Sequence, residues 1–265
     1  MARLQAVLWD VDGTLAETER DGHRVAFNQA FEACGLPWRW DEARYGELLR
    51  ITGGRERLLF DLKTRRDAPV LADERSALVA RLHQLKNARY AEILREAAIP
   101  LRPGVLDLMQ QCRERGVRMG IATTTSRTNV EALLRIHLGP QWAEWFAVRV
   151  CGEDVQRKKP DPEVYLQALQ ALGVGPLACV AIEDSPGGVA AARAAQIPVV
   201  VTLSAYFRAA TIEGAVAIGP GLDDRRNWRP ALRPHVPAVE REGQGVGLDD
   251  IEAWCAQMDT VSQYD

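Results

Sequence analysis

Residues 6–15 of the chain, AVLWDVDGTL, join a short apolar run to a turn that carries two aspartates. The run Ala6–Trp9 is continuously apolar, which is typical of a strand covered on both faces of a sheet. Side chains two residues apart in an extended segment point to the same side, so Asp10 and Asp12 share one side of the chain. Two such carboxylates repel each other unless a cation or a shared proton joins them. A solvated turn at Asp12–Gly13 is the alternative interpretation.

Further apolar runs have the same character and are separated by segments with helical periodicity. The runs are Val117–Ala122, Phe146–Val150, Cys179–Ile182 and Pro198–Leu203. The helical segments are Val105–Arg115, Asn129–His137, Pro162–Leu172 and Gly188–Ala195. This alternation predicts an α/β fold, a doubly wound parallel sheet with helices on both faces. Ligands of such sheets bind outside the carboxyl ends of the strands, so the residues after each run are the candidate site residues.

Residues 17–99 interrupt the alternation, because they contain helix-like segments and no convincing strand. Those segments are His23–Ala33, Asp41–Arg50 and Asp73–Ala98. Pro100 and Pro103 mark the return to the sheet, since proline disfavours helix continuation. We therefore predict a Rossmann-like core at residues 1–16 and 100–235 and an inserted helical cap domain at residues 17–99. A C-terminal extension at residues 236–265 follows, with a short helix at Leu248–Met258.

The composition is that of an ordinary globular chain, with 265 residues of which 47% are apolar and 26% charged. It excludes a disordered or collagen-like chain and a disulfide-stapled miniprotein. The 33 basic and 36 acidic residues give a net charge of −3, which argues against nucleic acid or an anionic membrane as a partner. The five cysteines include no CxxC pair, which indicates reduced thiols. Because neither a signal peptide nor a membrane-spanning run is apparent, we expect a cytoplasmic protein, and we separately expect a monomer.

Polar residues follow three more of the predicted strands. The second strand leads into the hydroxyls of Thr123–Ser126, the third is followed by Lys158–Pro160, and the fourth ends at Glu183–Asp184. Each has an ordinary explanation: a helix N-cap, a solvated basic loop or an acidic loop. Together with Asp10 and Asp12, however, they gather hydroxyls, a lysine and carboxylates at one edge of the sheet. That is the inventory needed to bind a phosphoryl group and Mg²⁺ beside a carboxylate nucleophile.

These segments resemble the motifs of a known enzyme superfamily. DVDGT at residues 10–14, the threonine after the second strand, KPDPEVY at 159–165 and EDSPGG at 183–188 resemble, in order and spacing, the four motifs of the haloacid dehalogenase-like phosphotransferases. The resemblance spans about Leu4–Ile218. LAETE, AFNQAF and TGGRERLL in the predicted cap are similar to the CbbY family of sugar bisphosphate phosphatases and, more distantly, to β-phosphoglucomutases.

The resemblance implies four catalytic roles. Asp10 would be the nucleophile that attacks phosphorus to give an aspartyl-phosphate. Asp12 would protonate the leaving sugar oxygen and then activate water, and for this its pKa would have to lie above the usual value of ~3.9. Thr123 would hydrogen-bond the phosphoryl group, and Lys159 would neutralise it. Lys158 is the alternative lysine.

The resemblance also implies a Mg²⁺ cofactor. The ion would be held by the Asp10 carboxylate, the backbone carbonyl of Asp12 and the Asp184 carboxylate. Glu183 would lie close by and act through water. Without such a metal and a phosphate, Asp12 and the Glu183–Asp184 pair would have no purpose, which disfavours a dehalogenase.

Substrate specificity would come from the cap. The candidate substrate-binding residues are Glu19, Gly53, Gly54, Arg55, Lys86, Thr124 and Asn129. The two glycines allow a close backbone approach, and Arg55 offers a bidentate fork for a second phosphate. Lys86 and His83 share one helix face, where a surface role is the alternative. His23 corresponds to a histidine of the mutases, although it lies eleven positions beyond Asp12, one more than the mutase spacing.

The sequence therefore predicts a Mg²⁺-dependent phosphatase that acts through an aspartyl-phosphate. Its expected substrate is a small sugar phosphate, a ketopentose bisphosphate such as xylulose-1,5-bisphosphate. A sugar phosphomutase would use the same intermediate and is the main alternative. A phosphorelay receiver also gathers acidic residues, a threonine and a lysine around Mg²⁺, but it lacks a large inserted cap.

Overall fold

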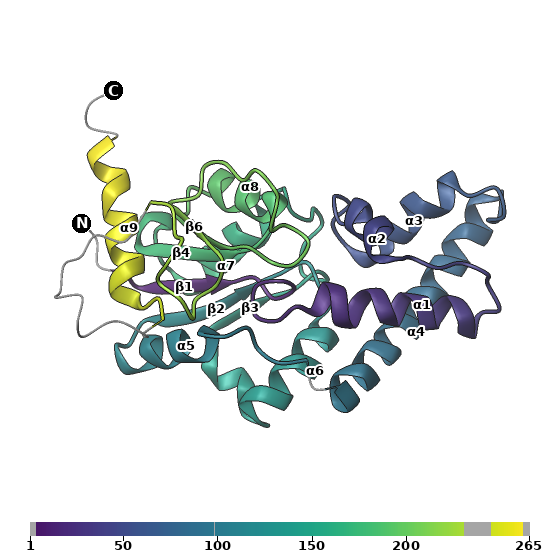
Figure 1. The fold of residues 1–265 in the computed structure, drawn as a ribbon, viewed down its shortest axis with the longest axis horizontal. Coiled ribbons are helices and arrows are strands. Elements are labelled where there is room, and N and C mark those ends of the chain that lie inside the picture. The colour runs from purple at the N-terminus through teal and green to yellow at the C-terminus, as the bar shows by residue number, and fades with distance from the viewer. Residues whose placement is uncertain (1–3, 98, 231–244, 262–265) are drawn as a thin grey trace.

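The computed structural model describes residues 4–97, 99–230 and 245–261, which contain a six-stranded sheet flanked by helices (Figure 1). The strands are β1 (Ala6–Trp9), β2 (Arg118–Ala122), β3 (Val148–Val150), β4 (Cys179–Glu183), β5 (Val199–Thr202) and β6 (Ala217–Gly219). They lie in the order β3-β2-β1-β4-β5-β6, and every pairing is parallel. Trp9 at the end of β1 is level with Ile121 in β2 and Ile182 in β4, so the residues after these strands meet at one edge.

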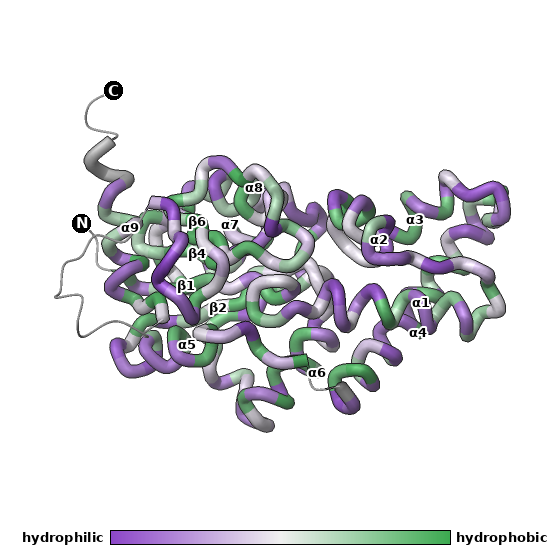
Figure 2. Tube along the Cα trace, in the orientation of Figure 1, coloured by the Kyte–Doolittle hydropathy of each residue, from purple (hydrophilic) through white to green (hydrophobic). Residues whose placement is uncertain are grey.

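Helices cover both faces of the sheet. Val7 and Trp9 of β1 belong to the apolar cluster that includes α5 (Val105–Glu114), α6 (Arg127–Leu138) and α9 (Leu248–Val261). Ala6 and Leu8 point the other way, into the cluster formed with α7 (Glu163–Leu172) and α8 (Pro186–Ala194). The surrounding helices alternate between hydrophilic and hydrophobic residues along their length (Figure 2). The predicted doubly wound α/β fold is confirmed.

The helices that follow β1 lie beyond one end of the sheet (Figure 1). They are the π-helix η1 (Glu19–His23) and the α-helices α1 (Arg24–Ala33), α2 (Glu42–Leu48), α3 (Gly54–Thr64) and α4 (Ala72–Ala97). We call residues 19–97 the helical lobe. It has an apolar cluster of its own, in which the rings of Phe27, Phe31 and Trp40 pack with centroids 4.8–6.4 Å apart.

Two elements differ from the sequence-based expectation. The short strand β6 is not among the predicted apolar runs. Helix α3 begins at Gly54, directly after Gly53 with φ +95°, because Gly53 adopts a backbone conformation that other residues rarely reach. The 3₁₀ helices η2 (Trp142–Trp145) and η3 (Pro176–Ala178) complete the connections.

Helix α9 is part of the core and closes one face of it. Trp254 is 1% exposed and stacks on Trp228 with ring centroids 4.7 Å apart. Arg115, which follows α5 directly, donates to Asp249 and Glu252 of α9, at 2.7 Å in each case. The predicted boundary between residues 235 and 236 lies outside the described residues. No helix among the described residues has both the length and the apolarity to cross a membrane.

Trp254→Ala should lower the free energy of unfolding by about 3–5 kcal/mol, because it empties a packed site in the core. Urea unfolding measures this loss. Leu177→Ala, at a side chain that is 64% exposed, is the control and should change stability by less than about 0.5 kcal/mol. Equal stability of the two variants would contradict a structural role for α9.

Candidate active site

The turn after β1 brings its backbone close to the end of β4. Asp10 N donates to Ile182 O at 3.1 Å, and Gly13 N donates to Ala16 O at 2.8 Å. Gly13 has φ +86°, and a Cβ there would lie 2.1 Å from a carboxylate oxygen of Asp184. Only glycine therefore allows this turn to pack against the Asp184 carboxylate.

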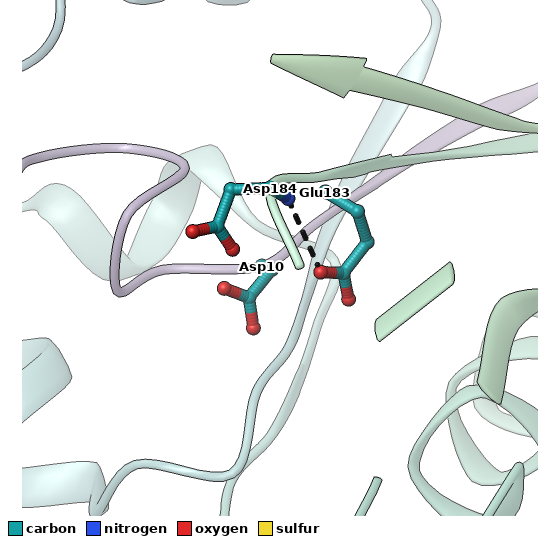
Figure 3. Close-up of side chains that lie close together, drawn as sticks. All are labelled: Asp10, Glu183 and Asp184. Atoms are coloured by element: carbon teal, nitrogen blue, oxygen red, sulfur yellow. Dashed lines mark hydrogen bonds between the residues drawn. The ribbon is translucent and has the colours of Figure 1, made fainter. Parts of the chain in front are cut away.

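Three buried carboxylates meet at this edge of the sheet. Asp10 follows β1, Glu183 ends β4, and Asp184 comes next; one oxygen of each lies within 4.8 Å of the others (Figure 3). Lys159 Nζ donates to Asp10 Oδ1 at 2.6 Å, Glu183 Oε1 at 2.7 Å and Ala122 O at 2.8 Å. Lys159 thus pairs with two of the three carboxylates, and negative charge is in excess.

The pKa values reflect this excess. Burial raises the pKa of Asp10 to about 7, and the charges of Glu183 and Asp12 add to the rise, although Lys159 opposes it. Burial, with the charges of Asp10 and Glu183, raises the pKa of Asp184 well above its ordinary value. Burial alone would lower the pKa of Lys159, but Asp10 and Glu183 outweigh it and raise that pKa. The cluster of hard oxygen donors therefore fits a divalent cation.

Asp12 lies in a different environment from Asp10. Its Oδ1 accepts hydrogen bonds from Thr18 Oγ1 at 2.6 Å and from His23 Nε2 at 2.9 Å, and the His23 ring stacks on Tyr90. Burial alone would raise the pKa of Asp12, but the His23 charge and the bonds from His23 and Thr18 lower it below its ordinary value. The expectation of a raised pKa for Asp12 is therefore wrong, because both donors stabilise the carboxylate.

His23 reaches Asp12 through a π-helical turn. Its spacing of eleven residues from Asp12 includes η1, whose π-helical hydrogen-bond pattern spans one residue more than an α-turn. The π-helical turn thus accommodates the additional residue between Asp12 and His23, and the two side chains remain in contact.

The end of β2 supplies two hydroxyls. Thr123 is buried and its backbone N donates to Val150 O at 3.0 Å, whereas Thr124 is half-buried. Asn129 does not line the cavity between the sheet and the helical lobe, in contrast to its prediction as a substrate contact. Its side-chain amide instead donates to Thr125 Oγ1 at 3.1 Å and to Asn87 Oδ1 at 3.5 Å. Asn129 therefore supports the loop after β2.

The cavity between the helical lobe and the sheet has a volume of about 680 Å³. The core lines it with Asp10, Asp12, Thr123, Thr124, Lys159 and Asp184, and the lobe with Glu19, Gly53, Gly54, Arg55, His83 and Lys86. All the predicted substrate-binding residues except Asn129 therefore lie on one cavity. Glu183 is 0% exposed and lies behind Lys159.

The lobe side of the cavity carries buried charge. Glu19 Oε2 accepts from Tyr45 Oη at 2.5 Å and lies 3.5 Å from a guanidinium nitrogen of Arg57. Lys86 is 4% exposed, and its ammonium lies over the rings of Phe27 and Tyr90. Burial lowers the pKa of Lys86 to about 8, although the charges of Asp12 and Glu19 oppose this. The alternative of a surface role for Lys86 is wrong.

Sequence reasoning missed three residues of this site. Tyr165 donates to Glu183 Oε1 at 2.5 Å and its ring lies beside Lys159, yet in the sequence it is only the last letter of KPDPEVY. Arg57 is 5% exposed and lines the cavity two residues after Arg55. Thr18, which donates to Asp12, carries no chemical signal of its own.

The comparisons with known proteins identify the family. Residues 4–196 match the model of the haloacid dehalogenase-like hydrolases. The chain belongs to this family of hydrolases. It is therefore an enzyme, which argues against a phosphorelay receiver. Two similar proteins are CbbY of Rhodobacter capsulatus, 46% identical over 77% of this chain and 88% of the relative, and plasmid-borne CbbY of Cupriavidus necator, 39% identical over 95% and 96%.

Solved structures of other proteins share the fold of this chain. A crystal structure of a CbbY mutant from Rhodobacter sphaeroides in complex with xylulose-1,5-bisphosphate has a TM-score of 0.77 and 41% identity, covering 82% of this chain and 94% of that one. A β-phosphoglucomutase from Clostridium difficile has a TM-score of 0.65 at 20% identity, covering 82% and 91%. At that identity the mutase supports the fold alone.

We predict that a divalent cation stabilises this hydrolase more at about pH 8 than at about pH 6. The raised pKa of Asp10, about 7, means that the metal-free fold keeps protons there at low pH and loses stability as the pH rises through that value. A cation must displace those protons, so it binds more tightly at high pH. Thermal unfolding with and without MgCl₂ measures the difference, each kcal/mol corresponding to about 2–4 °C in Tm.

Asp184→Asn is the control for this experiment, because it removes one carboxylate of the cluster and should abolish the shift in Tm. A shift of the same size at both pH values, or one that survives in Asp184→Asn, would contradict a metal site formed by these carboxylates.

Proposed function

We propose that the protein is a Mg²⁺-dependent phosphatase that hydrolyses a small sugar bisphosphate, a ketopentose bisphosphate such as xylulose-1,5-bisphosphate. The observation that carries the proposal is the meeting of Asp10, Lys159 and Asp184 beneath a cavity that the helical lobe covers. The bisphosphate complex of a relative that is 41% identical supports the choice of substrate.

Mg²⁺ is the cation that this site fits best. The proposed ligands are the Asp10 and Asp184 carboxylates and the backbone carbonyl of Asp12, with Glu183 acting through water. Few protein oxygens at such a site suit Mg²⁺, which keeps several waters and shares phosphate oxygens. Bound there, it would keep the carboxylates ionised and withdraw charge from the phosphoryl oxygens.

Asp10 is the proposed nucleophile. Its carboxylate oxygen attacks phosphorus as the bond between phosphorus and the sugar oxygen breaks, which leaves an aspartyl-phosphate. Lys159 already holds Asp10 Oδ1 at 2.6 Å, so it fixes the carboxylate for attack and balances charge on the phosphoryl group. The Thr123 hydroxyl donates a hydrogen bond to a phosphoryl oxygen. Water then attacks phosphorus, which releases phosphate and restores Asp10.

Asp12 is the proposed site of proton transfer. The departing sugar oxygen takes up a proton, and the pair formed by Asp12 Oδ1 and His23 Nε2 is the proposed source. The lowered pKa keeps Asp12 ionised, so a carboxylate is present to accept the proton of the attacking water. Contact with His23 and Thr18 orients the carboxylate for both steps.

The helical lobe, which corresponds to most of the predicted cap at residues 17–99, is the proposed source of specificity. Glu19 would accept hydrogen bonds from sugar hydroxyls. Gly53 and Gly54 would bring backbone N–H groups to the substrate, and the guanidinium of Arg55 would bind the phosphate that is not transferred. Closure of the lobe over the substrate would exclude bulk water from the aspartyl-phosphate. We also propose that the enzyme is a cytoplasmic monomer.

Asp10→Asn should lower phosphate release by about 10⁴-fold or more, because the variant lacks the nucleophilic carboxylate. A colorimetric phosphate assay over a panel of sugar mono- and bisphosphates, with Mg²⁺ present, measures this and ranks the substrates. Full activity of the variant would overturn the role of Asp10. An isomerised sugar phosphate that appears faster than free phosphate would identify a mutase instead.

Arg55→Ala should raise KM for sugar bisphosphates by about 10- to 100-fold, the loss expected for one charge-assisted contact to phosphate. KM for monophosphates should change by less than about threefold, because they lack the second phosphate. Steady-state kinetics with a matched mono- and bisphosphate pair test the difference. Equal losses on both substrates would argue against a contact between Arg55 and the second phosphate.

A further inference from the structure

Two adjacent lysines of the loop before α7 reach different sides of the cavity. Lys159 points into the core, to Asp10 and Glu183. Lys158 points to the helical lobe, where its Nζ lies 2.9 Å from Glu56 Oε2 of α3. Both lysines line the cavity. The chain thus presents one cation to the reacting end of the cavity and a second to the lobe.

The place that Lys158 occupies is tightly packed against the start of α3. A Cβ on Gly53 would lie 2.8 Å from Lys158 Nζ and 2.1 Å from Glu56 Oε2. The same turn of α3 carries Arg55, and a Cβ on Gly54 would lie 3.4 Å from the ring of His83. Lys158 therefore lies beside the glycine pair, in the part of the lobe that is proposed to bind the second phosphate.

This end of the cavity carries an excess of positive charge. His83 is half-buried, and burial together with the charges of Lys86, Arg55 and Lys158 lowers its pKa to about 4. Glu56 is the carboxylate that opposes these charges at His83, and its side chain is 45% exposed. The cluster therefore has the character of a subsite for a dianion.

The pair formed by Lys158 and Glu56 is one that a phosphate can displace. A partly exposed ion pair of this kind contributes little to stability. A phosphate monoester carries a charge of about −1.5 to −2 and three acceptor oxygens, so it attracts the ammonium more strongly than a single carboxylate does. Glu56 can turn to solvent when the exchange takes place.

We propose that Lys158 is a specificity residue that leaves Glu56 and binds the phosphate of the substrate that is not transferred. Glu56 holds the lysine at the subsite until substrate arrives. Because Lys158 comes from the core and Arg55 from the lobe, a bisphosphate would join the two parts of the protein, and a monophosphate would not. This inference rests on the proposed sugar bisphosphate phosphatase function.

The alternative is that Lys158 and Glu56 only link the lobe to the core. The two explanations differ in the effect of removing the Glu56 carboxylate. If the pair is only a link, Glu56→Gln and Lys158→Met remove the same ion pair, and both weaken the link. If Lys158 binds phosphate, Glu56→Gln releases the lysine for the substrate, and the two variants have opposite or unequal effects.

The test is steady-state kinetics of both variants on a sugar bisphosphate and on the matching monophosphate. Lys158→Met should raise KM for the bisphosphate by about 10- to 100-fold, with kcat and the monophosphate kcat/KM changed by less than about threefold. Glu56→Gln should leave KM for the bisphosphate unchanged or lower it. Lys158→Arg, which keeps the charge, should restore KM to within about threefold of the wild type.

Arg157→Met is the matched control. It removes a positive charge one residue earlier, from a side chain that is 72% exposed, pairs with Asp161 and Glu163 and does not line the cavity. It should leave KM for both substrates unchanged. Thermal unfolding of each variant checks that the fold is intact.

Several outcomes would overturn the inference. One is a rise in KM for the bisphosphate in Glu56→Gln that equals the rise in Lys158→Met. Another is an equal loss of kcat/KM in Lys158→Met on the bisphosphate and on the monophosphate. The third is an unchanged KM for the bisphosphate in Lys158→Met. The wild type is measured first, so that a failure of the proposed function can be distinguished from a failure of the role proposed for Lys158. If it releases no phosphate from sugar phosphates, the proposed function fails, whereas turnover without a selective effect of Lys158→Met contradicts only the role of Lys158.

Discussion

The arrangement of the site depends on one electrostatic constraint: three buried carboxylates meet at the carboxyl edge of the sheet, and the Lys159 ammonium group pairs with only two of them. Asp10, Glu183 and Asp184 can be this close only because β1 and β4 are neighbours in a parallel sheet. Glycines make the packing possible. A Cβ on Gly188 would lie 1.8 Å from a carboxylate oxygen of Glu183, much as Gly13 leaves room for Asp184. Such a concentration of buried charge lowers the free energy of unfolding unless protons or a cation neutralise it. The fold therefore loses stability in forming this cation site.

The same constraint separates the two aspartates of the first motif. Asp10 and Asp12 are two residues apart, yet the pKa of Asp10 is raised to about 7 and that of Asp12 is lowered. The difference comes from partners, because Asp10 faces other carboxylates whereas Asp12 accepts bonds from Thr18 and His23. Carboxylates whose environments push their pKa values apart can take different chemical roles. The helical lobe contributes to this separation, since His23 belongs to its first turn.

Much of the fold could be predicted from the sequence because its signals are local. Continuous apolar runs marked the central strands, and the rule that ligands gather at carboxyl ends of parallel strands brought the four motif segments to one edge. The short strand β6 was not predicted, because its three residues carry little periodicity. Helix α3 was not predicted, because the glycine pair at its start is typical of a loop. The lowered pKa of Asp12 could not be predicted, since it depends on where a π-helical turn places His23. The role of Asn129 could not be predicted either, because its sequence position does not reveal that its side-chain amide donates a hydrogen bond to Thr125.

The loop before α7 carries two lysines of the cavity, and the core holds this loop in place. The backbone N–H groups of Gln156 and Arg157 donate to the Glu163 carboxylate at 2.9 and 3.0 Å, which ties the loop to the first turn of α7. Lys158 and Lys159 come directly after Arg157, so the core fixes the backbone from which both side chains extend, while Glu56 of the lobe holds the Lys158 ammonium group. The lobe contributes the remaining contacts from α3 and α4. A ligand with anionic groups at both ends would thus meet a lysine of the core at each end, and the lobe would add Arg55 at the second end. The residues at the two ends of the cavity come from segments far apart in the sequence, and only the folded chain reveals which of them act together.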